Sequence, residues 1–362
     1  MLSFNTVNEL FKNDQISDLA RTEDGIKFLK LRSLSRKSLM KYLVGKYSIN
    51  ITNVSFRGWL KIVYESNLQL DEIDESILEI YETERANRRA SEEQLVSELY
   101  KIQSFEWGGL HQNSLERAIV NNYVKKITSY EMLSNAIEHE LYSSMRAYVL
   151  ASWYNHWTSI IIEDIFQDHE NVIPAVGRIK KIDFFIKNKP FDLKVTYLPE
   201  GFIKESRKAQ NLRPELTLMK QTAKQLEIGF DQSVADSVLI QDLWQKLEDH
   251  PHQSATNLIT EIQEFREMLL NSAMANPEFL VRWLYENQGV RRFDASNRLF
   301  LVLVDKKNFF NSWKLKRAKP LISETVNSYL NQTSESIGFS LDFNWEGQTY
   351  NAESDIIFVI KP

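Results

Sequence analysis

The stretch IDFFIKNKPFDLKVTYLP, from Ile182 to Pro199, decides how the rest of the chain is interpreted. Two runs rich in β-branched and aromatic residues, IDFFI and FDLKVTYL, predict two strands. The KNKP segment between them predicts a turn, in which Asn188 and Pro190 supply the backbone geometry. The sequence therefore predicts a β-hairpin, but one that carries charges where a buried hairpin would be apolar.

The charges of the hairpin form a pattern of their own. Asp183 lies near the start of the first strand, and Asp192 and Lys194 lie two residues apart on the second. Since side chains alternate along a strand, Asp192 and Lys194 emerge on one face. Two carboxylates suit a hard cation such as Mg²⁺, and a lysine beside them offsets their charge. The competing interpretation is an ordinary cross-strand ion pair between Asp183 and Lys194, which leaves Asp192 without a role.

The segment IDFFIKNKPFDLK resembles the PD-(D/E)-x-K motif of restriction-endonuclease-like nucleases. Asp183 matches the first acid, Asp192 the second acid and Lys194 the lysine. Ile182 stands where the motif usually has proline, and the second acid is aspartate where glutamate is commoner. The motif covers roughly residues 129–196, and the order of expected elements extends the resemblance to residue 362.

The same family often adds an acid on the helix before the hairpin. NHWTSIIIEDIFQDH offers Glu163 or the adjacent Asp164, and only one can face the hairpin because neighbours on a helix differ by about 100°. The resemblance implies Mg²⁺ on Asp183 and Asp192, with help from Glu163 and from the backbone carbonyl of Leu193. It also implies metal activation of a water, with a lysine that orients the water or steadies the developing charge.

The remaining elements predict a mixed α/β fold, with a mixed central β-sheet flanked by helices and a mainly helical N-terminal domain. Helices are expected at 114–126 and 129–167, followed by the hairpin and a helical insertion at about 205–290. NRLFLVLVD (297–305) is typical of a strand buried on both faces. A helix interrupted at Pro320 and two final strands follow. We expect a nuclease domain at 105–362 and a basic helical domain at 1–104, with Gly108 and Gly109 at the boundary.

The N-terminal domain shows an abrupt reversal of charge. Residues 26–64 hold nine basic and no acidic residues, and residues 65–84 hold eight acidic and no basic ones. Two basic helices, the first capped by Ser35, are compatible with a helix-turn-helix; a solvated basic face is the alternative. The side chains expected to contact DNA are Arg36, Lys37, Lys41, Lys46, Arg57, Lys61, Lys208 and Arg213.

Composition narrows the possible chemistry. The chain of 362 residues is 43% apolar and lacks cysteine, which excludes disulfides and thiolate chemistry. No histidine pair has the spacing of a zinc site, and no phosphate loop or nucleophile elbow is present. No apolar run reaches the roughly 20 residues of a membrane span, and the start lacks the pattern of a secretory signal. We therefore expect a cytoplasmic protein that does not bind membranes.

The sequence thus predicts a Mg²⁺-dependent DNA endonuclease, most like a type II restriction enzyme that cuts double-stranded DNA at a specific sequence. Analogy with the family implies a homodimer and a cognate DNA methyltransferase as a partner. Two alternatives stay open. One is a phage-defence or repair nuclease without sequence-specific cutting, and the other is a catalytically inactive DNA-binding protein.

Overall fold

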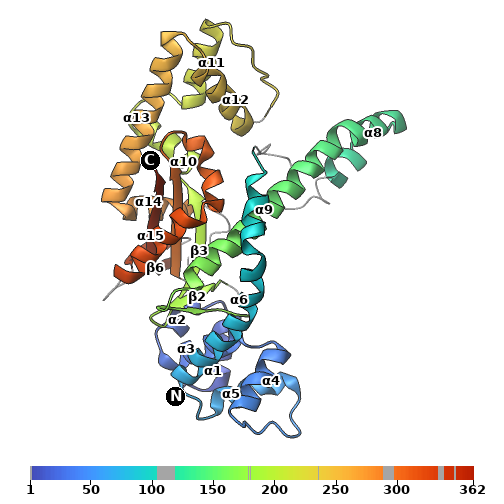
Figure 1. Ribbon diagram of the computed structural model, residues 1–362, viewed down its shortest axis with the longest axis vertical. Coiled ribbons are helices and arrows are strands. Elements are labelled where there is room, and N and C mark those ends of the chain that lie inside the picture. Colours follow the sequence, from blue (N-terminus) through green and yellow to red (C-terminus); the bar gives the residue numbers. More distant parts are fainter. Residues whose placement is uncertain are drawn as a thin grey trace.

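The computed structural model describes residues 2–103, 119–177, 179, 181–234, 236–287, 297–332, 338–345 and 348–362. It has a mixed α/β architecture, in which helices surround an open six-stranded sheet of order β1-β2-β3-β4-β6-β5 (Figure 1). The strands are β1 (Val172–Pro174), β2 (Phe184–Ile186), β3 (Lys189–Tyr197), β4 (Asn297–Asp305), β5 (Phe339–Trp345) and β6 (Gln348–Lys361). The expected mixed sheet flanked by helices is confirmed.

The helices follow the sequence periodicity closely. Those of the N-terminal part are α1 (Phe4–Lys12), α2 (Ile16–Ala20), α3 (Glu23–Ser33), α4 (Lys37–Lys46), α5 (Phe56–Glu65) and α6 (Leu70–Tyr100). Before the sheet lie η1 (Val120–Val124), α8 (Tyr130–Ala136), η2 (Ile137–Leu141) and α9 (Tyr142–Gln167). The later ones are α10 (Glu200–Ala209), α11 (Glu215–Gln225), α12 (Asp236–Glu248), α13 (Gln253–Ala275), α14 (Pro277–Asn287), η3 (Phe309–Arg317) and α15 (Lys319–Gln332). No helix of the described ranges is long and apolar enough to cross a membrane.

Strand pairing divides the sheet into antiparallel edges and a parallel centre. β1, β2 and β3 form an antiparallel meander, β3, β4 and β6 run parallel, and β5 returns antiparallel to β6. Every residue of β4 is buried, as expected of a parallel strand covered on both faces. The prediction of a buried strand at 297–305 is therefore confirmed.

The hairpin forms at the predicted place, but its turn is tighter than expected. Lys187 and Asn188 have φ of 49° and 64°, and two successive left-handed residues are typical of a two-residue type I′ turn. Pro190 lies inside β3, where it pairs with Phe185. The prediction that Pro190 shapes the turn is wrong, because the turn closes before it.

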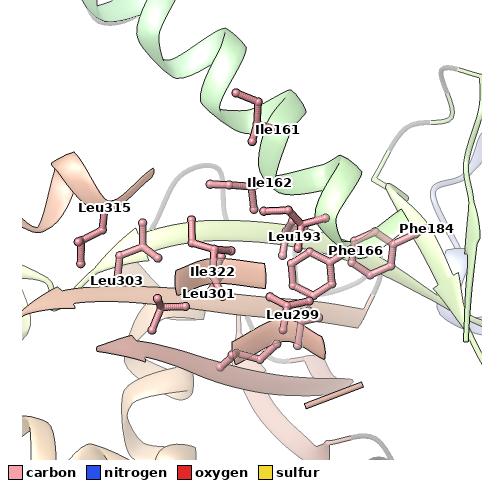
Figure 2. Packing of buried hydrophobic residues seen from close by; sticks show 14 of the residues in the cluster. Ile161, Ile162, Phe166, Phe184, Leu193, Leu299, Leu301, Leu303, Leu315 and Ile322 are labelled. Carbon is pink, nitrogen blue, oxygen red and sulfur yellow. The ribbon is translucent and has the colours of Figure 1, made fainter. Parts of the chain in front are cut away.

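Two apolar cores cover the two faces of the sheet. On one face, α9, η3 and α15 pack against side chains such as Leu193, Leu299 and Leu301 (Figure 2). On the other face, α10, α13 and α14 pack against Phe300, Val302 and the other residues of that face. Because Leu193 faces the first core, its neighbours Asp192 and Lys194 emerge on the opposite side of β3.

The N-terminal helices pack against the edge of the sheet that carries β1 and β2. Ile182 and Phe185 belong to the same apolar core as α1 to α6. Gly177, just after β1, passes so close to the backbone of Ser33 that an added Cβ would lie 1.6 Å from its carbonyl oxygen. The mainly helical character of residues 1–103 is confirmed; the expected domain boundary at 104–105 lies outside the described residues.

Several local expectations about helices need correction or refinement. The residue that caps α4 is Arg36, without a side-chain bond, so Ser35 is not the cap. The connection between α4 and α5 runs from Tyr47 to Ser55, longer than the roughly three to four residues of a helix-turn-helix. The helix expected at 129–167 forms but is interrupted by η2, which is a π-helical turn. The helix expected around Pro320 is divided in two, as predicted, but the break falls at Ala318, between η3 and α15, and Pro320 lies in the first turn of α15.

A cluster of arginines and carboxylates joins α6 to α9. Arg85 is 1% exposed and pairs with Glu92 at 2.6 Å, Asp168 at 2.9 Å and Asp164 at 3.4 Å. Arg88 binds Asp164 through two hydrogen bonds of 2.7 and 2.9 Å. Since buried charges are stable only when they are paired, these contacts fix how α6 and α9 lie against each other.

Replacing the buried arginine should therefore destabilise the fold strongly. Arg85→Met leaves Asp164, Asp168 and Glu92 with one cation fewer, and we expect a loss of about 3–5 kcal/mol in the free energy of unfolding. Arg89→Met is the matched control, because Arg89 also pairs with Asp168 but is 46% exposed; its loss should stay below about 1 kcal/mol. Urea unfolding measures both. Equal losses would show that α6 and α9 do not depend on the buried charge.

Candidate functional site

The hairpin places the two predicted aspartates opposite each other. Phe184 pairs with Phe191, so Asp183 and Asp192 occupy the next pair of positions along the two strands. The Asp183 N–H donates to the carbonyl of Phe191 at 2.8 Å, and the N–H of Leu193 donates to Asp183 Oδ2 at 2.7 Å. Hydrogen bonds to the backbone of β3 therefore fix both the main chain and the carboxylate of Asp183. The second of these bonds places Leu193 directly beside the carboxylate.

Lys194 pairs with the acid of its own strand. Its Nζ donates to Asp192 Oδ1 at 2.6 Å, while 43% of the lysine side chain stays exposed. This contradicts the alternative of a simple cross-strand pair between Asp183 and Lys194. Asp192 instead serves as the lysine's partner, and Lys194 keeps an open side toward solvent.

Arg298 is a member of the cluster that the sequence analysis missed. It lies next to Asp192 in the register of β3 and β4, and its Nε is 3.8 Å from Asp192 Oδ2. The guanidinium also lies over the ring of Tyr285, 4.7 Å from its centroid. The signal was visible as a lone arginine in the apolar run NRLFLVLVD, although nothing local connects it with the hairpin.

The structure distinguishes the two candidate acids of α9. Asp164 is buried against α6, where Arg88 and Arg85 bind it. Glu163 lies on the side of Asp183: burial, together with the charges of Asp183 and Asp164, raises the pKa of Glu163 to about 7, and Lys194 opposes the rise. Glu163 is therefore the helix acid that shares the site with the hairpin.

Asp183 is affected in the same way as Glu163. Burial and the charge of Asp192 raise the pKa of Asp183 to about 6, whereas the hydrogen bond from Leu193 and the charge of Lys194 lower it. The site thus gathers three carboxyl groups, from α9, β2 and β3, against the cations of Lys194 and Arg298. The pKa values of two of the three carboxyl groups are raised because these groups are buried and lie near other negative charges.

The three carboxyl groups offer oxygen donors of the kind that bind divalent cations. Carboxylate oxygens are the ligands that Mg²⁺ prefers. A cation would offset the negative charge that, after burial, raises these pKa values. The residues that would hold such a cation are Asp183, Asp192 and Glu163. Leu193 lies next to Asp192 in β3. Within the described part of the chain, however, no three His, Asp or Glu side chains already converge as a metal-binding group. Metal binding would accordingly draw Asp192 away from Lys194.

The basic residues of the N-terminal part divide into two groups. Several of them neutralise the acidic helix α6: buried Lys30 donates to Asp74 at 2.7 Å, and Lys46 donates to Glu79 at 2.8 Å. Lys61 lies 3.8 Å from Glu65. The reversal of charge along the sequence is thus partly an internal pairing of α3 and α4 with α6.

The other basic residues remain available to a ligand. Four of them are exposed and form no ion pair with any residue that the structure describes: Arg36, Lys37, Lys41 and Arg57. Lys208 and Arg213 are also exposed, at the end of α10 and in the following loop, and Arg213 binds Gln221 at 3.0 Å. Of the eight side chains predicted to contact DNA, Lys46 forms the closest ion pair within the protein, at 2.8 Å from Glu79.

Comparisons with known proteins add no relatives to this description. A scan against protein-family models finds no matching family, and searches of curated proteins and of solved structures find no match. The site must therefore be interpreted from its own geometry.

The raised pKa of Glu163 predicts a stability that falls as pH rises. Between about pH 4.5 and 7 the folded protein holds a proton on Glu163 that the unfolded chain has released, so unfolding becomes easier with pH. We expect a loss of roughly 2 kcal/mol over this range without divalent cations. Glu163→Gln should remove most of that slope above pH 6. Urea unfolding at several pH values measures it.

The exposed Glu170→Gln variant serves as the control and should keep the slope of the unmodified protein. A Glu163→Gln variant with an unchanged slope would show that this carboxyl group keeps an ordinary pKa in the folded state.

Proposed function

We propose that this protein is a Mg²⁺-dependent DNA endonuclease with a restriction-endonuclease-like core. One observation supports it most: α9, β2 and β3 bring Glu163, Asp183, Asp192 and Lys194 into one electrostatically coupled cluster. These are the residues that match the nuclease motif. A fold that needed only stability would pair these acids fully, because unpaired buried carboxylates are costly.

The described elements support the same proposal. The hairpin precedes a helical insertion, a buried parallel strand and a closing helix, in the order expected of a nuclease core that extends from the motif. Asp192 and Lys194 lie on the face of β3 opposite to Leu193. Their charges therefore do not disturb the apolar packing of Leu193. Sequence-specific cutting of the type II kind remains the expected form of the activity.

Each side chain has a distinct part in the proposed reaction. Asp183 and Asp192 would hold the cation, with Glu163 beside them. A bound cation would supply polarisation of the phosphate and a water of lowered pKa. Lys194, with its exposed ammonium, orients the attacking water or steadies the charge that develops on the phosphate. The Nε of Arg298 lies 3.8 Å from Asp192 Oδ2, and its charge would help to position that carboxylate.

A second candidate is a DNA-binding protein without catalysis. The observation that favours it is the pairing of Asp192, whose two oxygens face Lys194 and Arg298. If a metal displaces neither Lys194 nor Arg298 from Asp192, the cluster consists of ion pairs alone. In that case the exposed basic residues of the N-terminal part carry the function alone.

Digestion of plasmid DNA separates these possibilities. The purified protein should cut with Mg²⁺ and not with EDTA, and Asp192→Ala and Lys194→Ala should each lower the rate by at least about a hundredfold. Lys189→Ala is the matched control, because Lys189 belongs to the same strand but pairs with Glu353 at 2.7 Å; it should keep its activity.

The products then identify the kind of nuclease. Discrete bands favour a restriction enzyme, and a smear favours a phage-defence or repair nuclease. An unmodified protein that binds methylated and unmethylated DNA tightly and cuts neither would overturn the proposal in favour of the non-catalytic candidate.

Charge reversal tests the N-terminal surface independently of cutting. In EDTA, Lys37→Glu with Lys41→Glu should weaken binding to every DNA sequence by a similar factor, about tenfold or more, and lower the salt dependence. Lys46→Ala should weaken binding far less, because Glu79 already pairs with Lys46. Fluorescence anisotropy with two unrelated duplexes measures the affinity. A loss confined to one sequence would mean that these residues contact bases instead.

A further inference from the structure

A cavity lies at the edge of the sheet where the chain leaves β3 and β4. These two strands run parallel, and they end at Tyr197 and Asp305. The cavity has a volume of about 300 Å³, and the end of β3, the start of α10, helix α12 and η3 line it. Tyr197 is five residues beyond Asp192, which corresponds to roughly 16 Å along a strand. The cavity is therefore a second site, distinct from the cluster of carboxylates at the hairpin.

The course of the chain opens this edge of the sheet. After β3 the chain turns to α10, whose Phe202 and Ile203 belong to the core on one face. After β4 it turns through η3 to α15, and Trp313 and Ile322 of these helices belong to the core on the opposite face. Connections that diverge in this way leave a crevice beyond the carboxyl ends of the strands, which is where open α/β sheets bind ligands. The fold thus favours a ligand site at this cavity.

Aromatic rings line much of the cavity, and they come from the end of β3 and from η3: Tyr197, Phe309, Phe310 and Trp313. Cations of the protein already lie over two of these rings. Lys316 Nζ is 5.7 Å from the centroid of Tyr197, and the guanidinium of Arg266 is 4.4 Å from that of Phe310. These cations would repel a cationic ligand, whereas a neutral planar ring stacks well on aromatic side chains.

Glu200 and Gln241 are the longer polar side chains of the lining. The side chain of Glu200 is 55% exposed, and its Oε2 accepts a hydrogen bond of 2.9 Å from the buried Arg266. Because a carboxylate accepts about four hydrogen bonds, most of this capacity stays open to a ligand. Gln241 is half-buried and forms no hydrogen bond among the residues that the structure describes. The cavity thus combines aromatic walls with an anchored carboxylate and an open amide.

We propose that this cavity binds a guanine base. The base stacks against the aromatic side chains of η3, its N1–H and N2–H donate to the carboxylate of Glu200, and Gln241 donates to O6. Adenine has a lone pair at N1 where guanine has an N–H, so the same carboxylate repels adenine. A free nucleotide and a base rotated out of a nucleic acid strand offer the same chemistry. The proposal goes beyond DNA cleavage and does not rest on it.

Calorimetric titration of the full chain in EDTA tests the proposal with three nucleotides. The chain should bind 5′-GMP. Because 5′-IMP lacks the N2 amine, it should bind about tenfold more weakly. Because 5′-AMP turns the lone pair of N1 toward Glu200, it should bind at least about a hundredfold more weakly.

Glu200→Gln tests the contact that selects guanine. It should weaken the binding of 5′-GMP by about tenfold or more. The preference over 5′-AMP should fall to within about threefold, because an amide also offers a donor to N1 of adenine. Glu205→Gln is the matched control, since Glu205 lies on the same helix but binds Trp283 Nε1 at 2.7 Å outside the lining. It should keep both affinities.

Phe310→Leu tests the stacking independently of Glu200. It should weaken 5′-GMP and 5′-AMP by a similar factor, about tenfold, and so preserve the ratio between them. Thermal unfolding followed by circular dichroism checks that each variant is folded.

Short single strands identify the source of the base. If the base comes from a nucleic acid strand, an oligothymidylate with a central guanosine should bind more tightly than plain oligothymidylate, and Glu200→Gln should remove that advantage. Equal binding of the two strands, together with binding of 5′-GMP, identifies the free nucleotide as the ligand.

Two results would overturn the proposal. One is the absence of binding to 5′-GMP together with equal binding of the two strands. The other is a chain that binds 5′-GMP and 5′-AMP equally, or whose preference for guanine survives Glu200→Gln. Because the titration needs neither Mg²⁺ nor cleavage, its failure leaves the nuclease proposal intact, and a chain that binds guanine without cutting DNA contradicts the nuclease proposal alone.

Discussion

The register of the β2–β3 hairpin is the constraint on which the candidate site depends. A two-residue turn at Lys187 and Asn188 fixes which residues face each other, and the side chains of a strand alternate between its faces. A slip of one residue would turn Asp192 and Lys194 into the apolar core and expose Leu193. The left-handed turn therefore determines both the core and the charged cluster. Asparagine tolerates such a conformation better than most residues, which fits its place at the second turn position.

Helix α6 connects the N-terminal helices to α9 through ion pairs. Its acidic N-terminal half neutralises lysines of α3 and α4, and its arginines bind the carboxylates of α9. By engaging Asp164, α6 leaves Glu163 to face the hairpin. The N-terminal helices and the site are thus connected through charges on one long helix. The basic surface that remains exposed is smaller than the sequence alone suggests.

Features with a local cause could be predicted from the sequence, whereas features set by distant contacts could not. The hairpin, the buried strand β4 and the helix break just before Pro320 each follow from patterns within about ten residues. The pairing of Arg298 with Asp192 joins residues far apart in the chain. Which of Glu163 and Asp164 lies on the side of the hairpin depends on the arginines of α6, which bind Asp164. Which basic residues are paired and which stay exposed depends on the carboxylates of α6. Propensity and periodicity carry no information about such tertiary contacts.

The position of Glu163 beside Asp164 has a consequence for the long helix α6. The charge of Asp164 raises the pKa of Glu163, and the charge of Arg88 lowers it. Loss of the Arg88 charge would therefore raise the pKa of Glu163 further. The acidity of the candidate site thus responds to a side chain on a helix that contributes no member to it.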